Sequence, residues 1–348
     1  MKAITIREFG GPGVLRLEEL PTPVPAADEV LIRVHSVSVN QTLDLKVRAG
    51  VYRNDLRFPL VLGVDPSGEI VDVGPGVPDS RIGQHVSVLS TTRCGNCRFC
   101  LMKREDSCQH SGHIGLDRWG GYAEYISVPA QNAIPIPEGL SFAEATVITR
   151  HFPTGINLLL NQALLQKGEW VLIMGAAGAL GSCGVQISKV HGAHVIAAAG
   201  ADDRAAAARD YGADHVINYR QQDLAAEVMR ITDGHGVDVV FENIADPTLW
   251  PGAFNSLAFA GRLVTAGAHG GGTVPLDVKR LYLRRLRIIG QPGTNLKDVE
   301  LALKLAAEGK IRAIIDRVMP LTKVGEAHDL LANNQIVGKI VLDPTLTA

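Results

Sequence analysis

Four of the chain's five cysteines lie close together, and their spacing is typical of a metal-binding loop. Cys94, Cys97, Cys100 and Cys108 form a C-x2-C-x2-C-x7-C run, whereas Cys183 lies far downstream. Four closely spaced thiolates can bind one zinc ion in a tetrahedral site, and the ion then orders a loop that is too short to form a hydrophobic core. Two disulfides would need an oxidising compartment, which nothing in the sequence indicates, and the common iron–sulfur spacings differ from this one. We predict one structural zinc ion per chain, with no ligand position open to substrate.

A glycine turn is the second stretch whose residue types suggest chemistry. Residues 170–181 read WVLIMGAAGALG, an apolar run followed by a tight turn, and Ser182–Val190 continues as a helix-like segment. The N-terminus of a helix binds phosphate through free N–H groups when the turn before it lacks bulky side chains. Gly178 and Gly181 meet that need, so the stretch predicts a dinucleotide site. The alternative is a turn that is rich in glycine only for packing.

The elements around this turn have the order of a nucleotide-binding domain. A strand is expected at 193–199, a helix at 203–211 and a short strand at 215–219. This βαβαβ order indicates a parallel sheet covered by helices. The pattern continues with strands at 237–244, 261–267 and 286–290 and a helix at 250–257.

The segments on either side of this domain have another character. Residues 1–90 are strand-like and divided by turns, with strands expected at 29–34 and 37–39. The last fifty or so residues carry no nucleotide motif, and helices are expected at 296–308 and 323–333. Because 348 residues exceed the usual size of one core, we predict two domains, with the C-terminal segment returning to the first.

Charge and hydropathy narrow the class of partner. The net charge is −2 and the isoelectric point about 6.6, which gives no basic stripe for nucleic acid and no polybasic membrane patch. Residues 1–6 alternate like a strand, unlike a secretion signal, and no apolar run reaches the roughly 18 residues of a membrane span. We therefore expect a cytoplasmic protein with a small-molecule substrate, no nucleic acid and no membrane partner.

The cysteine run, the glycine turn and the segment 63–74, GVDPSGEIVDVG, occur in an order that resembles the medium-chain dehydrogenase/reductase superfamily. YAEY at 122–125 and GKIVL at 338–342 strengthen the resemblance, which covers essentially the whole chain. It implies an α/β fold with the active site in a cleft between two domains. One is a GroES-like β domain, 1–151 and 293–348 with a zinc lobe at 94–108, and the other a Rossmann doubly wound parallel-sheet domain, 152–292.

The chain departs from the zinc alcohol dehydrogenases of that superfamily at the catalytic metal. Where they have a cysteine, a histidine and a further cysteine or acid, this sequence has Asn40 (or Gln41), Val64 and Arg150. None is a usual zinc ligand, and a guanidinium repels a cation. The chain is similar in this respect to the zinc-independent quinone-oxidoreductase and enoyl-reductase branches, so we expect no catalytic zinc.

That loss constrains the reaction. Hydride transfer to a simple ketone leaves charge on one oxygen, which zinc normally stabilises as a Lewis acid. Enones, enoyl thioesters and quinones instead delocalise the charge into an enolate that hydrogen-bond donors can support. We therefore predict an NADPH-dependent oxidoreductase that transfers hydride to an activated C=C bond or a quinone without a catalytic metal.

The resemblance also suggests catalytic residues. Tyr52 lies in a Gly-Val-Tyr setting like that of the catalytic tyrosine in the enoyl-reductase branch, and a protonated phenol can donate to an enolate. The alternative is a tyrosine that only lines the cleft. Asn40 and Gln41 share one expected role, that of an amide near the substrate or the nicotinamide.

The choice of cofactor rests on the end of the second Rossmann strand. NAD-binding units place a carboxylate there, whereas Ala199-Gly200 offers none. Arg204 keeps a cation, and Tyr219 matches an aromatic residue that flanks the phosphate-bearing adenosine in related reductases. Asp202 and Asp203 oppose NADP but also fit the first turn of a helix. We predict NADP(H), bound by Thr154, Gly178, Ala179, Leu180, Gly181, Gly200, Arg204, Tyr219 and Gly267.

Two alternatives stay open. One is a zinc-dependent alcohol dehydrogenase with a rearranged metal site that recruits Asp44, Asp65 or His151. The other is a redox-inactive NADPH-binding protein. The resemblance also implies a homodimer, or a dimer of dimers, in which sheet edges near Leu286–Gly290 pair across a two-fold axis.

Overall fold

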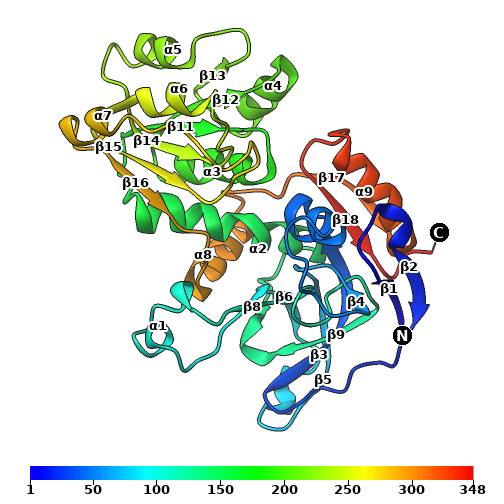
Figure 1. The fold of residues 1–348 in the computed structure, drawn as a ribbon. Helices are drawn as coiled ribbons and strands as arrows, with labels where there is room; N and C mark the ends of the chain where they lie inside the picture. Colours follow the sequence, from blue (N-terminus) through cyan, green and yellow to red (C-terminus); the bar gives the residue numbers. More distant parts are fainter. Residues whose placement is uncertain (348) are drawn as a thin grey trace. The chain divides into compact units, whose positions relative to one another are not determined.

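Figure 1 shows the computed structural model of the protein, which describes residues 1–347 except for the side chain of Glu105. The chain forms two compact units. The first runs from Met1 to Arg150 and includes the chain from Val299 onward, and the second is His151–Asp298. Their limits therefore lie at 150/151 and 298/299, compared with 151/152 and 292/293 expected from the sequence.

The first unit is built mainly on antiparallel strands. Its larger sheet has the order β10-β6-β5-β3-β18-β17, with β9 paired to β3, and its smaller sheets are β2-β1-β4 and β7-β8. The strands are β1 (Lys2–Ile6), β2 (Arg16–Glu19), β3 (Glu29–Ser38), β4 (Leu60–Val61), β5 (Ser67–Val73), β6 (His85–Val88), β7 (Thr91–Thr92), β8 (Gly112–His113), β9 (Tyr125–Pro129), β10 (Ala133–Pro135), β17 (Ile315–Pro320) and β18 (Lys339–Asp343). Alternating side chains such as Val30, Ile32 and Val34 fill its core.

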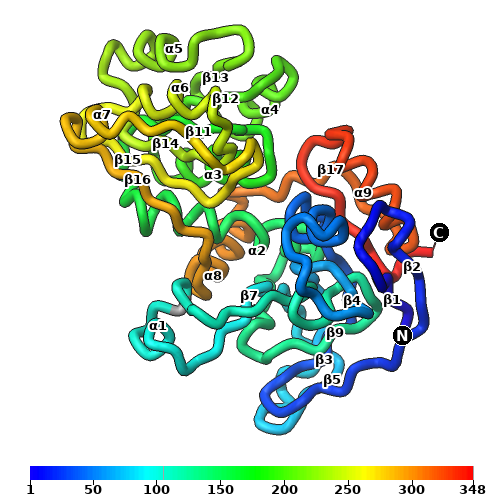
Figure 2. Tube along the Cα trace, viewed as in Figure 1, coloured from blue at the N-terminus to red at the C-terminus, as the bar shows by residue number. Residues whose placement is uncertain are grey.

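The helices of this unit connect the strands and lead to the second unit. They are α1 (Arg98–Leu101), a π-helix (Gln41–Lys46), α2 (Phe142–Ile156), α8 (Leu296–Ala307) and α9 (Val324–Ala332), of which α2 and α8 span the unit limits. Figure 2 shows the C-terminal segment, in red, returning to the blue N-terminal strands. There β18 pairs with β3, Val341 opposite Ser38, so the chain end completes the sheet that carries Asn40.

The second unit is a six-stranded parallel sheet of order β13-β12-β11-β14-β15-β16. In chain order this is 3-2-1-4-5-6, the strand order of the Rossmann fold, which confirms the predicted sheet. Its strands are β11 (Trp170–Met174), β12 (His194–Ala199), β13 (His215–Asn218), β14 (Val237–Glu242), β15 (Leu257–Thr265) and β16 (Arg287–Gly290). Its helices are α3 (Ala179–Val190), α4 (Asp202–Asp210), α5 (Leu224–Ile231), α6 (Trp250–Asn255) and α7 (Val278–Leu283). No helix in the described part of the chain is both long and apolar enough to span a membrane.

Two expected boundaries were wrong for local reasons. The two strands expected at 29–34 and 37–39 form one strand, β3, because register shifts against β5 let it bend without ending. β15 begins at Leu257 instead of 261, and a register shift against β14 absorbs the extra residues.

Candidate functional site

The four clustered cysteines of the first unit come together as a metal site. Their sulfur atoms all lie within 4.8 Å of one another, with Cys94–Cys108 at 3.5 Å and Cys97–Cys100 at 3.6 Å. Zinc–sulfur bonds of about 2.3 Å in a tetrahedron give sulfur–sulfur edges of roughly 3.8 Å, whereas a disulfide bond is about 2.05 Å long. The cysteines are free, and their geometry fits one tetrahedral ion. Backbone N–H groups of Cys100 and Gln109 lower the pKa of Cys97 to about 6, whereas burial raises the pKa of Cys100 to about 12, so a bound ion would displace a proton from Cys100.

Asn40 stands where zinc alcohol dehydrogenases have a catalytic metal ligand. It lies in a buried polar network at the end of β3. Only 4% of Asn40 is exposed. Its Oδ1 accepts a hydrogen bond from Lys339 Nζ at 2.7 Å, and its Nδ2 donates to Asp65 Oδ2 at 3.2 Å. Both ends of the amide are therefore bound by protein. Gln41, which shares its predicted role, is exposed at the start of the π-helix.

Two buried carboxylates complete this network. Asp65 accepts hydrogen bonds from Ser38 N at 3.0 Å and Ser38 Oγ at 2.5 Å. Asp44 accepts from Asn40 N at 2.7 Å and Gly63 N at 3.1 Å. Burial and then the neighbouring Asp65 raise the pKa of Asp44 to about 6, against the opposing pull of Lys339. Donors thus occupy the oxygens that a rearranged metal site would need.

A second set of linked buried side chains lies in the same unit, and of its three members only Tyr122 belongs to a motif named above. Arg48 Nη1 lies 3.0 Å from His328 Nδ1, and His328 Nε2 lies 3.3 Å from Tyr122 Oη. Because arginine only donates, Nδ1 must accept, and the ring then donates from Nε2 to the tyrosine. Burial, and then Arg48, lower the pKa of His328 to about 3. The contacts among these residues were not predicted, because the three residues lie far apart in the sequence.

Tyr52 lies on the surface of the first unit just after the π-helix region, and 47% of it is exposed.

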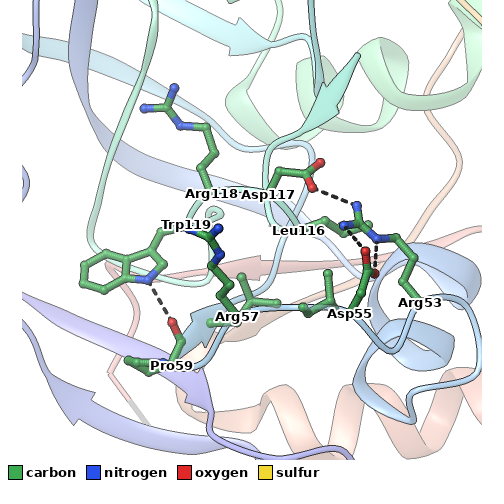
Figure 3. A pocket seen from close by; sticks show the side chains of 10 residues that line it. Arg53, Asp55, Arg57, Pro59, Leu116, Asp117, Arg118 and Trp119 are labelled. Atoms are coloured by element: carbon green, nitrogen blue, oxygen red, sulfur yellow. Dashed lines mark hydrogen bonds and ion pairs between the residues drawn. The ribbon is translucent and has the colours of Figure 1, made fainter. Parts of the chain in front are cut away.

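Next to it in the chain is Arg53, which lines a cavity of about 530 Å³ within this unit. Figure 3 shows Arg53 between two carboxylates, with Nε 2.8 Å from Asp55 and Nη1 2.8 Å from Asp117. The other lining residues are Leu56, Arg57, Pro59, Leu60, Leu116, Arg118 and Trp119. The role of Tyr52 stays a prediction.

In the second unit the predicted glycines form a cradle at the end of β11. Gly178 is the N-cap of α3, and Ala179, Leu180 and Gly181 make up its first turn. A Cβ atom on Gly181 would lie 2.2 Å from the carbonyl oxygen of Gly175, so no other residue fits there. A Cβ on Gly267 would lie 2.4 Å from the carbonyl oxygen of Asn243. This close-packed turn beside the helix N-terminus fits a pyrophosphate.

The predicted adenosine-side residues gather at the end of β12. A Cβ on Gly200 would lie 2.8 Å from Tyr219 Oη, so the two residues touch. Burial raises the pKa of Tyr219, while the nearby Arg220 and Arg204 lower it. Asp202 is held by Asn218 Nδ2 at 2.7 Å and Gln221 Nε2 at 3.2 Å. Within residues 1–347, Arg204 and Arg220 form no salt bridge, which leaves both cations open to an anion. Thr154 lies half-buried in α2.

Similarity to known proteins agrees with this two-unit oxidoreductase architecture. Residues 26–138 match the family described as alcohol dehydrogenase GroES-like domain, and residues 179–308 match zinc-binding dehydrogenase. An alcohol dehydrogenase of Geobacillus stearothermophilus is 32% identical over 98% of this chain and 99% of its own length. An acryloyl-coenzyme A reductase of Sulfurisphaera tokodaii is 29% identical over 99% of this chain and 100% of its own length. The crystal structure of an NAD-dependent alcohol dehydrogenase has a TM-score of 0.92 and 34% identity, and covers 99% of both chains.

The chain therefore belongs to the medium-chain dehydrogenase/reductase superfamily, as its sequence predicted. It combines a GroES-like domain with a Rossmann-like domain and is an NAD(P)H-dependent oxidoreductase. Relatives named as alcohol dehydrogenases and as an acryloyl-coenzyme A reductase match nearly the whole chain, so hydride transfer is supported while the substrate is not fixed by them.

Proposed function

We propose that this protein reduces an activated, conjugated C=C bond or a quinone with NADPH and without a catalytic metal ion. The observation that carries the proposal is the chemistry at the three positions where zinc-dependent relatives have ligands. Asn40 has both ends of its amide bound, Val64 is fully buried and apolar, and Arg150 is cationic. A zinc ion finds no thiolate, imidazole or free carboxylate in this set.

The charges around Asn40 support the proposal. Lys339 Nζ lies 2.7 Å from Asn40 Oδ1 and 2.8 Å from the carbonyl oxygen of Val39, so a buried cation is fixed beside the first of these positions. Like charges in a low-dielectric site repel strongly. A divalent ion would meet repulsion from Lys339 as well as from Arg150.

Bound NADPH supplies the hydride in such a reaction. The residues of this chain then support the charge left on the substrate and provide a proton. Tyr52 is our proton donor, because its hydroxyl belongs to an exposed side chain of the first unit that a substrate can reach. The resident zinc ion would be held by Cys94, Cys97, Cys100 and Cys108 and would have a structural role only.

The preference for NADPH rests on the cluster at the end of β12. Arg204 and Arg220 lie close enough to Tyr219 to lower the pKa of its phenol. No acid stands directly at the end of the strand, and Asp202, in the first turn of the helix that follows, is held by two amide groups. A 2′-phosphate would find two cations there, while the carboxylates of Asp202 and Asp246 nearby already accept hydrogen bonds from protein groups.

A zinc-dependent alcohol dehydrogenase is the second candidate, because several relatives are named alcohol dehydrogenases. Metal analysis of the purified protein, together with oxidation of both reduced cofactors against enones, enoyl thioesters, quinones and ketones, separates the two. One zinc per chain and reduction of conjugated acceptors with NADPH support our proposal. Two zinc ions per chain and reduction of ketones support the alternative.

We also propose a homodimer that pairs through β16. This strand ends the six-stranded sheet, so one of its edges has no partner strand within the described chain. An unpaired apolar edge invites pairing with a second copy.

A further inference from the structure

Three buried polar side-chain atoms, one on strand β8 and two on helix α2 of the first unit, have no hydrogen-bond partner among the described residues. They are His113 Nδ1, Thr149 Oγ1 and Arg150 Nε. Buried polar groups are nearly always paired in folded proteins, so each of these exceptions needs a partner that the described residues do not supply. Arg150 also makes no salt bridge within residues 1–347 and is only partly exposed.

Helix α2 carries Arg150 toward the carboxyl ends of β3 and β6. The Phe142 ring stacks on His35, with ring centroids 4.5 Å apart. One turn later, Thr146 Oγ1 lies 2.8 Å from Ser67 Oγ and 3.3 Å from the carbonyl oxygen of Ser36. Residues four apart share a helix face, so Arg150 continues this line beyond Thr146. In that direction β3 leads to Asn40.

The β7–β8 hairpin brings His113 to the same end of β6. Thr91 of β7 pairs with His113, and Ile114 N donates to the carbonyl oxygen of Ser90 at 2.9 Å. A Cβ on Gly115 would lie 3.1 Å from Val64 Cγ1, so the segment after His113 packs on Val64. His113 and Arg150 thus approach from a hairpin and a helix to the place where the metal ligands are absent.

The electrostatic interaction between Arg150 and His113 also indicates that the two side chains lie near each other. Burial lowers the pKa of His113 most, followed by the guanidinium of Arg150. Asp117 raises this pKa, and Arg53 lowers it further. Asp117 does not neutralise Arg150, because it accepts from His113 N at 2.7 Å and from Arg53 Nη1 at 2.8 Å. Arg150 remains a partly buried cation without a carboxylate partner, next to a neutral imidazole that can donate one N–H.

We infer that Arg150 and His113 form an anion site that holds the carbonyl oxygen of the substrate while it becomes an enolate oxygen. This inference rests on the proposed function. When the β-carbon accepts hydride, the C=C electron pair moves to join the α-carbon to the carbonyl carbon, and the carbonyl pair moves onto oxygen. The α-carbon then takes a proton, which restores the carbonyl, and the cofactor leaves oxidised. Arg150 takes the place of a Lewis acid by stabilising the negative oxygen with a fixed charge and a hydrogen bond.

The test uses the anion of dimedone, a cyclic 1,3-diketone that is a stable enolate at neutral pH, as a probe on the full chain with reductant present. Calorimetry should give an affinity that falls about tenfold to a hundredfold in Arg150→Met, as expected for loss of a charged hydrogen bond. His113→Phe should lose less, because it removes a neutral donor. Arg16→Met, which removes an exposed arginine of β2, should bind the probe like the wild type.

Kinetics provide the second measurement. For a conjugated acceptor, Arg150→Met should lower kcat at least tenfold with unchanged NADPH affinity, and added guanidinium ion should restore part of the rate. Arg150→Lys, which keeps the charge, should retain more activity and covers the case in which Arg150→Met does not fold. Unchanged probe affinity and kcat in folded Arg150 variants would overturn the inference. If the wild type reduces no conjugated acceptor but binds the probe through Arg150, the proposed function fails and the anion site stands.

Discussion

Lys339 illustrates how one side chain sets the character of this site. Its ammonium reaches Asn40 and the carbonyl oxygen of Val39 from the last strand of the chain. Asp44 and Asp65 balance it, so the network holds two acids and one base in a buried place. Such a network is costly to leave half-satisfied, and it fixes Asn40 in one orientation.

The pH dependence of stability should reveal the buried carboxyl group of Asp44. Its pKa is raised from 3.8 to about 6, so the folded state binds more protons than the unfolded state between about pH 4 and 6. Stability from this group is therefore present at low pH and is lost as pH rises through 6, by about 3 kcal/mol at most. The variant Asp44→Asn has no ionisable group at this position and therefore serves as the reference protein.

Denaturant unfolding of both proteins from pH 4 to 7 measures this effect as a difference. The wild type should lose stability relative to Asp44→Asn over that range, and the difference should level off as pH approaches 7. The difference between the two proteins removes the contribution of the other acidic groups to the pH dependence of stability. Several of these groups, such as Glu29 and Asp214, have lowered pKa values. A difference that does not change with pH would show that Asp44 is ionised throughout.

Arg204 should determine cofactor choice. Arg204→Ala should weaken NADPH binding about tenfold to a hundredfold, because a charged hydrogen bond to phosphate contributes roughly 1.5–3 kcal/mol. NADH affinity should hardly change, since NADH has only a hydroxyl at that place. Titration of both cofactors measures the ratio, with Arg209→Ala as an exposed control on the same helix. An unchanged ratio would remove Arg204 from the site and favour NAD.

At the scale of elements, we expect the order of the zinc lobe, residues 94–108, to depend on its metal. Its short helix α1 has one buried residue, Cys100, and no apolar core of its own. Removal of zinc by a chelator, or Cys97→Ser, should therefore lower the melting temperature and expose the lobe to protease. Cys183→Ser lies outside the lobe and should keep the full zinc content.

The same experiment separates a structural from a catalytic ion. Cys97→Ser that remains folded should still reduce a conjugated acceptor. A folded, zinc-free variant that binds NADPH and substrate normally but has no turnover would instead assign the metal to catalysis.

The elements that could be predicted from sequence are those with local signals. The glycine turn after Met174, the helix after it and the cysteine spacing each depend on neighbouring residues. The helix α5 was not predicted, although Asp223 caps it through Ala226 N at 2.9 Å. The contacts of the candidate site could not be predicted, because Asn40 and Lys339 meet only when β18 pairs with β3.

At the scale of the whole molecule, we expect a dimer at micromolar concentration. β16 offers a free edge at the end of its sheet, and Ile288 in it is 37% exposed. Ile288→Asp should shift the protein toward monomer, because it places a charge in the pairing edge, and sedimentation velocity measures the change. Arg16→Asp on β2 serves as a control. A wild type that sediments as a monomer would count against pairing through β16.

The central claim is that this oxidoreductase reduces a conjugated bond without a catalytic metal. In the most direct test, the zinc content of the purified protein is measured, and the protein is then incubated with NADPH and 2-cyclohexenone. The product is identified. Our account predicts cyclohexanone, the product of C=C reduction, from protein with one zinc ion per chain. Formation of 2-cyclohexenol, the product of C=O reduction, by protein with two zinc ions per chain would contradict it.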